Sequence, residues 1–132
     1  MNKYAVIIGE APEDYRMKKT EEIYDFLRSD KGGSIPSGNI IGFPQGVSEL
    51  MLEAVLDRMF NEETKSILLY FCTKVPVSND SPTLFIGGEE IRFDVIQHYQ
   101  NLAKKMEIDL QGIYDVCSEF ISEDELGYEK IS

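Results

Sequence analysis

A continuous apolar run, SILLYFC, occupies residues 66–72 near the middle of the chain. It has the length of a strand, and an apolar run without polar alternation is typical of a strand that is buried on both faces of a sheet. A second run, YAVIIG at residues 4–9, has the same character and is bounded by Glu10-Ala11-Pro12. We therefore expect a sheet of buried strands, with residues 4–9 near its centre.

Segments with helical periodicity lie between the predicted strands. The first begins around Met17 and ends before Gly32-Gly33, which supplies a stop signal. A short strand, NIIGF at residues 39–43, precedes a second helix. We assign the apolar stripe of that helix to Val47, Leu50, Met51, Ala54, Val55 and Met59. A third helix at residues 93–106 leads to a fourth strand at residues 111–117.

A pair of glycines, Gly87-Gly88, separates the segments TLFI and EEIRF. Glycine readily adopts the positive φ angles of a tight turn, so this pattern predicts a small antiparallel hairpin, reached through a loop at residues 75–81. Strands that alternate with helices imply right-handed crossovers and a mainly parallel sheet. The predicted fold is therefore of the α/β class, a three-layer α/β/α sandwich with a small β-hairpin.

The carboxyl ends of parallel strands meet at one rim of a sheet, where ligands and reactive groups gather. Three segments follow or end predicted strands: Gly9-Glu10, Cys72-Thr73-Lys74 and Cys117-Ser118. We expect these three segments to share one rim.

The composition is that of one globular domain. The chain has 132 residues, of which 42% are hydrophobic, so we treat residues 1–132 as a single domain that ends in an acidic tail at 118–132. A formal net charge of -11 argues against nucleic acid or an anionic membrane as partner and favours a basic peptide or protein. No apolar stretch approaches the roughly 20 residues of a membrane span. Two cysteines and no secretory leader predict a cytoplasmic protein with free thiols.

The order of these segments resembles the large-subunit half of the caspase-like cysteine peptidases, of the bacterial and metacaspase type. The resemblance covers residues 3–118 and is carried by KYAVIIGE, NIIGFPQGVSELMLEAVLDRMF, SILLYF, the hairpin around Gly87-Gly88, and GIYDVC. In that family a strand with an aromatic-rich end precedes a Ser-Gly-His-Gly element, and a later strand ends in Asp-x-Cys. The resemblance implies a caspase-like fold and cysteine peptidase chemistry.

The resemblance also assigns roles to individual residues. Cys117 falls at the nucleophile, and Asp115 at the acidic position that helps to line the pocket for a basic substrate residue. Lys74 stands in place of the catalytic histidine, and Val75 in place of the glycine whose N–H helps to hold the oxyanion. A cysteine nucleophile needs a base, or a cation that keeps it as thiolate. An exposed lysine has a pKa of about 10.4 and is almost fully protonated at neutral pH, so it is a poor base.

Three classes of function remain open. The leading hypothesis is a catalytically impaired caspase-like domain, a pseudoenzyme with a binding or regulatory role. The alternative is an active cysteine endopeptidase that uses Cys117 with an unorthodox base and prefers basic residues. The third class is a flavodoxin-like or receiver-like binding domain, which shares the alternation of strands and helices. That class predicts an Asp at the end of the third strand, where this chain has Cys72-Thr73-Lys74. The nucleotide-binding motifs Gly-x-Gly-x-x-Gly and Gly-x4-Gly-Lys-Ser/Thr are also absent from the sequence. We predict no cofactor.

The remaining reactive side chains have structural interpretations. His98 is the only histidine of the chain and falls on the polar stripe of the third helix, where we expect an ordinary surface residue. Cys72 is expected to pack in the core as a small apolar residue. Two cysteines and a distant histidine do not match the ligand spacing of a zinc site, so we predict no metal.

The fourth strand raises the question of what lies beside it. In the resembling family further strands pair there, and these 132 residues contain no such strands. The apolar side chains Ile113, Tyr114 and Val116 make an open edge a template for another chain. We expect this strand to form a homodimer, antiparallel across a two-fold axis, or to accept strands from a partner, unless the acidic tail folds back over the edge.

Overall fold

The computed structural model describes residues 1–10, 15–73, 83–116 and 120–122. Its strands are β1 (Asn2–Ile8), β2 (Tyr15–Met17), β3 (Ile40–Phe43), β4 (Thr64–Thr73), β5 (Thr83–Ile86), β6 (Glu89–Arg92), β7 (Asp109–Val116) and β8 (Phe120–Ser122). Its helices are α1 (Lys18–Arg28), α2 (Glu49–Met59) and α3 (Phe93–Met106), with the short 3-10 turns η1 (Asp30–Gly32) and η2 (Ser37–Asn39). Each strand and helix that the sequence predicts is present with small shifts in its bounds. The loop expected at residues 75–81 lies outside the described residues.

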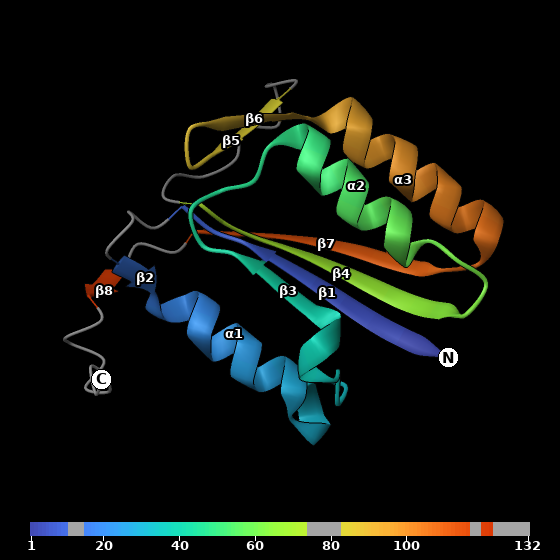
Figure 1. Cartoon of the computed structure of the whole chain (residues 1–132), viewed down its shortest axis with the longest axis horizontal. Helices are drawn as coiled ribbons and strands as arrows, with labels where there is room; N and C mark the ends of the chain where they lie inside the picture. Colours follow the sequence, from blue (N-terminus) through green and yellow to red (C-terminus); the bar gives the residue numbers. More distant parts are fainter. Residues whose placement is uncertain (11–14, 74–82, 117–119, 123–132) are drawn as a thin grey trace.

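Four strands form one parallel sheet in the order β3-β1-β4-β7 (Figure 1). The chain moves outward from β1 to β3 and then returns across β1 to β4 and β7. Crossovers of one hand place their helices on opposite faces when this direction reverses, so α1 covers one face and α2 and α3 cover the other (Figure 1). The predicted three-layer architecture is confirmed, and β1 and β4 are its central strands.

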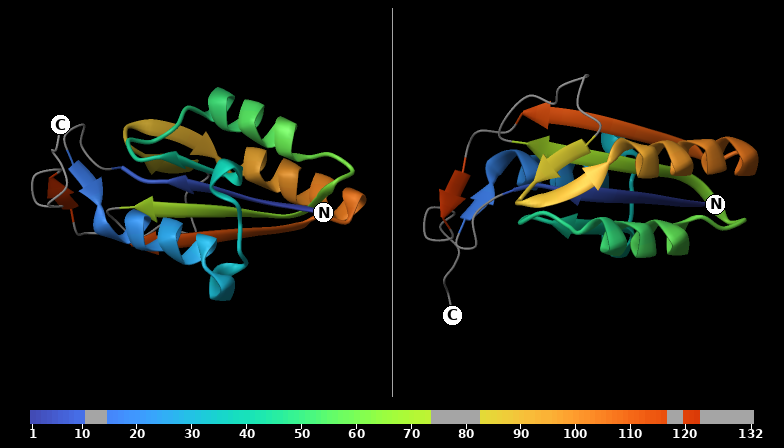
Figure 2. Two further views of the ribbon diagram at one scale, coloured as in Figure 1. Left: turned by 60° about the horizontal axis from the view of Figure 1, so that its bottom comes forward. Right: turned by 90° about the horizontal axis from the view of Figure 1, so that it is seen from above.

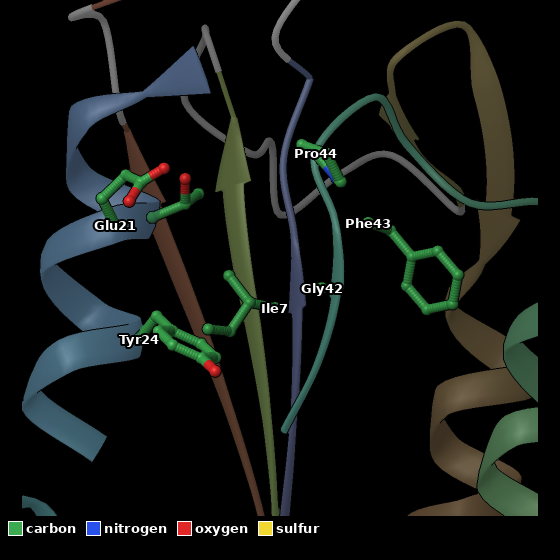
Figure 3. A pocket seen from close by; sticks show the side chains of 7 residues that line it. Ile7, Glu21, Tyr24, Gly42, Phe43 and Pro44 are labelled. Atoms are coloured by element: carbon green, nitrogen blue, oxygen red, sulfur yellow. The ribbon is translucent and has the colours of Figure 1, made fainter. Parts of the chain in front are cut away.

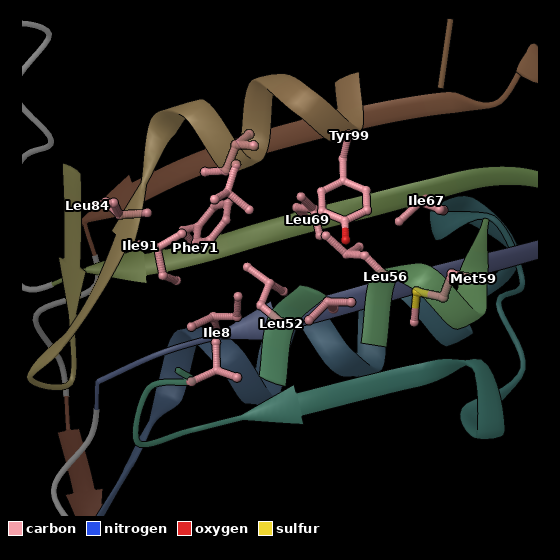
Figure 4. Close-up of a cluster of buried hydrophobic side chains, with 14 of the residues drawn as sticks. Ile8, Leu52, Leu56, Met59, Ile67, Leu69, Phe71, Leu84, Ile91 and Tyr99 are labelled. Atoms are coloured by element: carbon pink, nitrogen blue, oxygen red, sulfur yellow. The ribbon is translucent and has the colours of Figure 1, made fainter. Parts of the chain in front are cut away.

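The two central strands are buried on both faces, which explains their continuous apolar sequences. Successive side chains of a strand point to opposite faces and therefore enter two separate cores. The core beneath α2 and α3 receives from these strands Val6, Ile8, Ile67, Leu69 and Phe71 (Figure 4). The smaller core beneath α1 receives Ala5, Ile7, Tyr70 and Cys72.

The stripe predicted for helix α2 is right in part. Val47 and Met59 are buried and Val55 packs against the core, whereas Leu50 is 78% and Met51 51% exposed. The buried residues within the helix are Leu52, Leu56 and Met59, and their intervals of four and three residues keep them on one side of a helix with 3.6 residues per turn. Apolar residues occur on more than one side of this helix, so periodicity alone did not show that Leu52 and Leu56, rather than Leu50 and Met51, face the sheet.

The predicted hairpin is formed by β5 and β6, and Gly87 and Gly88 at its tip have φ angles of 63° and 81°. The tip packs closely on the loop after β3, because a Cβ on Gly87 would lie 2.8 Å from the carbonyl carbon of Gln45 and 2.9 Å from the Cα of Gly46. The carboxylate of Glu10, which follows β1, accepts a hydrogen bond of 3.1 Å from the N–H of Gly87. The hairpin therefore lies at the carboxyl ends of β1 and β3 (Figure 2).

A second small sheet was not predicted. Strands β2 and β8 pair antiparallel, with Tyr15 opposite Ser122 and Met17 opposite Phe120. Met17 thus belongs to a strand rather than to the first helix, and the segment expected to be a weakly patterned tail contains a paired strand. The pair lies at the carboxyl ends of the main strands, beside the start of α1 (Figures 1 and 2).

Candidate functional site

The carboxyl ends of β4 and β7 bring three polar side chains together. The hydroxyl of Tyr70 donates a hydrogen bond to Oδ2 of Asp115, and Oγ1 of Thr73 donates to the carbonyl oxygen of Asp115 at 3.4 Å. Tyr70 and Thr73 are only 5% and 2% exposed, whereas Asp115 is half-buried. The buried hydroxyl of Tyr70 therefore fixes the carboxylate of Asp115 at the rim, and Thr73 holds the main chain of the same residue.

The structure places Asp115 at the rim where the sequence led us to expect it. The other two predicted site residues, Lys74 and Cys117, lie outside the described residues. Thr73 immediately precedes Lys74, and Val116 immediately precedes Cys117. Thr73 and Val116 are opposite each other in the register of β4 and β7.

Cys72 is fully buried and belongs to the core beneath α1. The prediction that it packs as a small apolar residue is confirmed. Its position opposite Asp115 in the strand register makes it part of the support beneath the rim.

His98 lies on α3 and is exposed, as predicted. Its ring stands edge-on to that of Tyr99, with the ring centres 5.1 Å apart. The hydroxyl of Tyr99 donates to Oδ1 of Asp57 on α2 at 2.7 Å. Because α3 covers one face of the sheet and the Tyr70–Asp115 pair belongs to the opposite face, the sheet separates His98 from the carboxylate of Asp115.

Tyr114 points to the face opposite its neighbour Asp115. Its ring stacks on that of Phe71, with centres 5.0 Å apart and planes inclined by 7°. The ring of Phe93, the first residue of α3, stands edge-on to it at 6.0 Å. Burial between these rings raises the pKa of the Tyr114 phenol. The end of β7 is thus held from both faces of the sheet.

A pocket of about 260 Å³ lies at the carboxyl ends of β1 and β3, on the side of α1 (Figure 3). Glu21 and Tyr24 of α1 face Ile7 of β1 across it, while the ring of Phe43 points away to the other side (Figure 3). The described residues that line it are Ile7, Thr20, Glu21, Tyr24, Gly42, Phe43 and Pro44. Among these described residues Glu21 alone carries a charge, and its carboxylate favours a cationic or neutral group over a phosphate.

Sequence reasoning missed the role of Tyr70. It was read as one apolar residue in a buried strand, although a buried tyrosine hydroxyl usually finds a hydrogen-bond partner. Its place near the carboxyl end of that strand was the available signal. The partner itself depends on the register between β4 and β7, which the sequence does not specify.

Within the described parts of the chain, no group of three or more His, Cys, Asp or Glu side chains is placed to hold a metal ion. None of the helices described is both long and apolar enough to cross a membrane. No match to the chain was found among protein-family models, curated proteins or solved structures.

Proposed function

We propose that this chain is a catalytically impaired caspase-like domain that binds a protein or peptide in a regulatory role. The order of its elements supports the proposal, because the hairpin lies between β4 and α3, and β7 ends at the rim beside β4. This is the order on which the resemblance to the family rests. Asp115, the position associated with recognition of a basic residue, is held at that rim by Tyr70.

The position of His98 carries the proposal. It is the only histidine of the chain, and it lies exposed on α3 with the sheet between it and the carboxylate of Asp115. Cys117, two residues after Asp115 in the sequence, would as a nucleophile have no imidazole to accept its proton. The acidic recognition position is kept and the base is missing, which is the combination expected of a binding domain derived from a peptidase.

The rival hypothesis, an active endopeptidase, requires Cys117 to work with another base such as Lys74. Incubation of the purified chain with fluorogenic peptides that end in Arg, Lys or Asp, with and without calcium, separates the two. We expect no turnover above that of the matched Cys117→Ala variant. Turnover that disappears in Cys117→Ala would establish the peptidase instead.

The reactivity of the thiol gives an independent measurement. Without a base or a strong cation beside it, Cys117 should react with a small alkylating agent with a pH midpoint near the ordinary thiol value of about 8.5. The Cys117→Ala variant provides the background, since Cys72 is fully buried. A midpoint well below pH 7 would indicate an activated thiolate and contradict the proposal.

The strand order supports the flavodoxin-like hypothesis. If the strands of the main sheet are numbered along the chain, their order is 2-1-3-4, and the order of a flavodoxin-like sheet, 2-1-3-4-5, begins in the same way. The pocket at the ends of β1 and β3 opposes it, because its described lining contains the carboxylate of Glu21 and no basic side chain that would attract a phosphate. Thermal unfolding with and without flavin mononucleotide tests this hypothesis. We expect no shift of the midpoint, and a clear rise would favour the flavodoxin-like function.

A further inference from the structure

In the described part of the chain, strand β7 pairs only with β4 and stands at the end of the sheet, so no described strand lies on its other side (Figure 1). The alternative to an open edge was that the acidic tail covers it, but β8, the described part of that tail, pairs with β2. An eight-residue edge strand presents a row of N–H and C=O groups that another strand can bind.

The side chains of β7 do not block this edge. Proteins usually protect an open edge with lysine, proline or a bulge. Strand β7 reads DLQGIYDV, without lysine or proline, and it pairs with β4 without a register shift. Its two charged residues, Asp109 and Asp115, stand near its ends, so the stretch between them is uncharged. Ile113 and Tyr114 are each 40% exposed and Val116 is 48% exposed. The edge therefore combines main-chain groups open to pairing with exposed apolar side chains.

We propose that β7 pairs antiparallel with β7 of a second copy of this chain, about a two-fold axis that passes through Ile113. The axis places Ile113 opposite Ile113 of the second copy. Every other pair then occurs twice by symmetry: Gly112 opposite Tyr114, Gln111 opposite Asp115, and Leu110 opposite Val116. The two four-stranded sheets join into one continuous sheet.

Three of these kinds of cross-strand pair are favourable and the fourth is neutral. The two kinds of aliphatic pair contribute packing across the junction. The amide of Gln111 can donate to the carboxylate of Asp115, because a carboxylate has about four acceptor positions and keeps its bond from Tyr70. The ring of Tyr114 stays on Phe71 and Phe93, and Gly112 opposite it has no side chain that could collide with it. The sequence of β7 is thus complementary to itself in this register.

Neighbouring registers lack this complementarity. An axis through Gly112 would place Asp109 opposite Asp115 of the second copy, and like charges directly opposite destabilise a strand pair. An axis half a residue to either side of Ile113 would place Leu110 or Gly112 opposite Asp115. Either shift removes the acceptor from Gln111. An axis through Tyr114 would place Ile113 opposite Asp115 and would also take that acceptor away from Gln111. Among these registers, only the axis through Ile113 pairs Gln111 with Asp115 and the aliphatic side chains with one another.

A cysteine on the axis tests this register directly. Opposite residues have Cβ atoms about 4.5–5.5 Å apart, so Ile113→Cys in a Cys117→Ser background should give a covalent dimer with a short bis-maleimide. The matched control is Gln111→Cys in the same background. Its two copies would lie four residue steps apart, about 13 Å or more, beyond the reach of that reagent. Equal cross-linking of both variants, or of neither, would overturn the register.

Light scattering on the unmodified chain tests the association itself. We expect a concentration-dependent dimer that tightens as ionic strength rises from about 0.01 M to about 1 M, because screening weakens the repulsion between two copies of charge -11. Ile113→Lys, at an exposed position, should raise the dissociation constant at least roughly tenfold while the circular dichroism spectrum stays unchanged. A monomer at every concentration and ionic strength, or a dimer that Ile113→Lys leaves intact, would overturn the proposal.

Discussion

The close contact between the hairpin tip and the loop after β3 makes a quantitative prediction, because the tip contains its own control. Gly87 and Gly88 are adjacent, and both have positive φ angles, 63° and 81°. A Cβ on Gly87 would lie 2.8 Å from the carbonyl carbon of Gln45 and 2.9 Å from the Cα of Gly46, whereas a Cβ on Gly88 would meet nothing within 4 Å. An alanine at either position therefore carries the cost of a positive φ angle, but only an alanine at Gly87 also collides with neighbouring main-chain atoms.

The expected magnitudes follow from these two terms. A left-handed backbone costs an alanine roughly 1–2 kcal/mol, so Gly88→Ala should lower the free energy of unfolding by about that amount. The atoms that a Cβ on Gly87 would strike belong to the main chain and cannot rotate away, so Gly87→Ala should add about 1–3 kcal/mol of overpacking. With a urea slope of about 1–3 kcal/mol per molar, 2 kcal/mol separates the two midpoints by roughly 1 M.

Urea unfolding followed by circular dichroism measures both variants under the same conditions. Gly46→Ala provides a reciprocal check, because its Cβ would lie 2.6 Å from the carbonyl oxygen of Ile86 in the same contact. The double variant Gly46→Ala with Gly87→Ala should cost less than the sum of the single changes, since one displacement of the tip relieves both clashes. Equal midpoints for Gly87→Ala and Gly88→Ala would refute the docking of the hairpin.

Two further predictions concern hydrogen bonds made by carboxylates of α2, Asp57 with Tyr99 and Glu49 with Arg92. Both use urea midpoints measured over a range of pH. Burial, with the hydrogen bond to Asp57, raises the pKa of Tyr99 above its usual value of 10.0, so the contribution of Tyr99 to folding stability is present below pH 10 and declines above it. The change Tyr99→Phe should lower the free energy of unfolding by about 1 kcal/mol at neutral pH and flatten the decline above pH 10. Parallel pH profiles for the two proteins would contradict this. The hydrogen bonds from Arg92 lower the pKa of Glu49 below 4.5, so the contribution of this pair to folding stability is present above about pH 4.5 and is lost in more acidic solution. The change Glu49→Gln should flatten that acidic decline of stability. An unchanged acidic profile would show that the pair does not stabilise the fold.

The main strands were predictable because burial on both faces leaves a direct mark on the sequence. A strand covered by helices on two sides needs apolar residues at every position, and residues 4–9 and 66–72 satisfy this. The hairpin was predictable because two positive φ angles in a tight turn call for Gly87-Gly88. In these segments the local sequence pattern and the tertiary environment favour the same secondary structure.

The missed features depend on partners that are distant in the sequence. Strands β2 and β8 have three residues each, YRM and FIS, and neither is recognisable without the other. The orientation of α2 was ambiguous because Leu50 and Met51 are as apolar as the buried Leu52 and Leu56. The tertiary structure resolved the ambiguity by packing Leu52 and Leu56 under α2 against the sheet.

At the candidate site, the sequence placed Asp115 but not the groups that hold it. A strand end can be located from an apolar run, and parallel strands share a rim, so the position of Asp115 followed from pattern alone. The hydrogen bond from Tyr70 requires the register of β4 against β7. Register is fixed by the packing of whole strands, and no short motif encodes it.

The supports of β7 determine how the two proposals relate to each other. On one face Tyr114 is held by Phe71 and Phe93, and on the other Asp115 is held by Tyr70. A strand fixed from both faces loses little conformational freedom when a second strand pairs with it, which lowers the entropic cost of association. The proposed recognition of a partner would use the carboxylate of Asp115, whereas the proposed self-pairing would rest mainly on the main-chain groups of β7 and would use that carboxylate only as the acceptor for Gln111. A chain without peptidase activity could therefore still dimerise, and a monomeric chain could still bind through Asp115, so each proposal stands or falls on its own experiment.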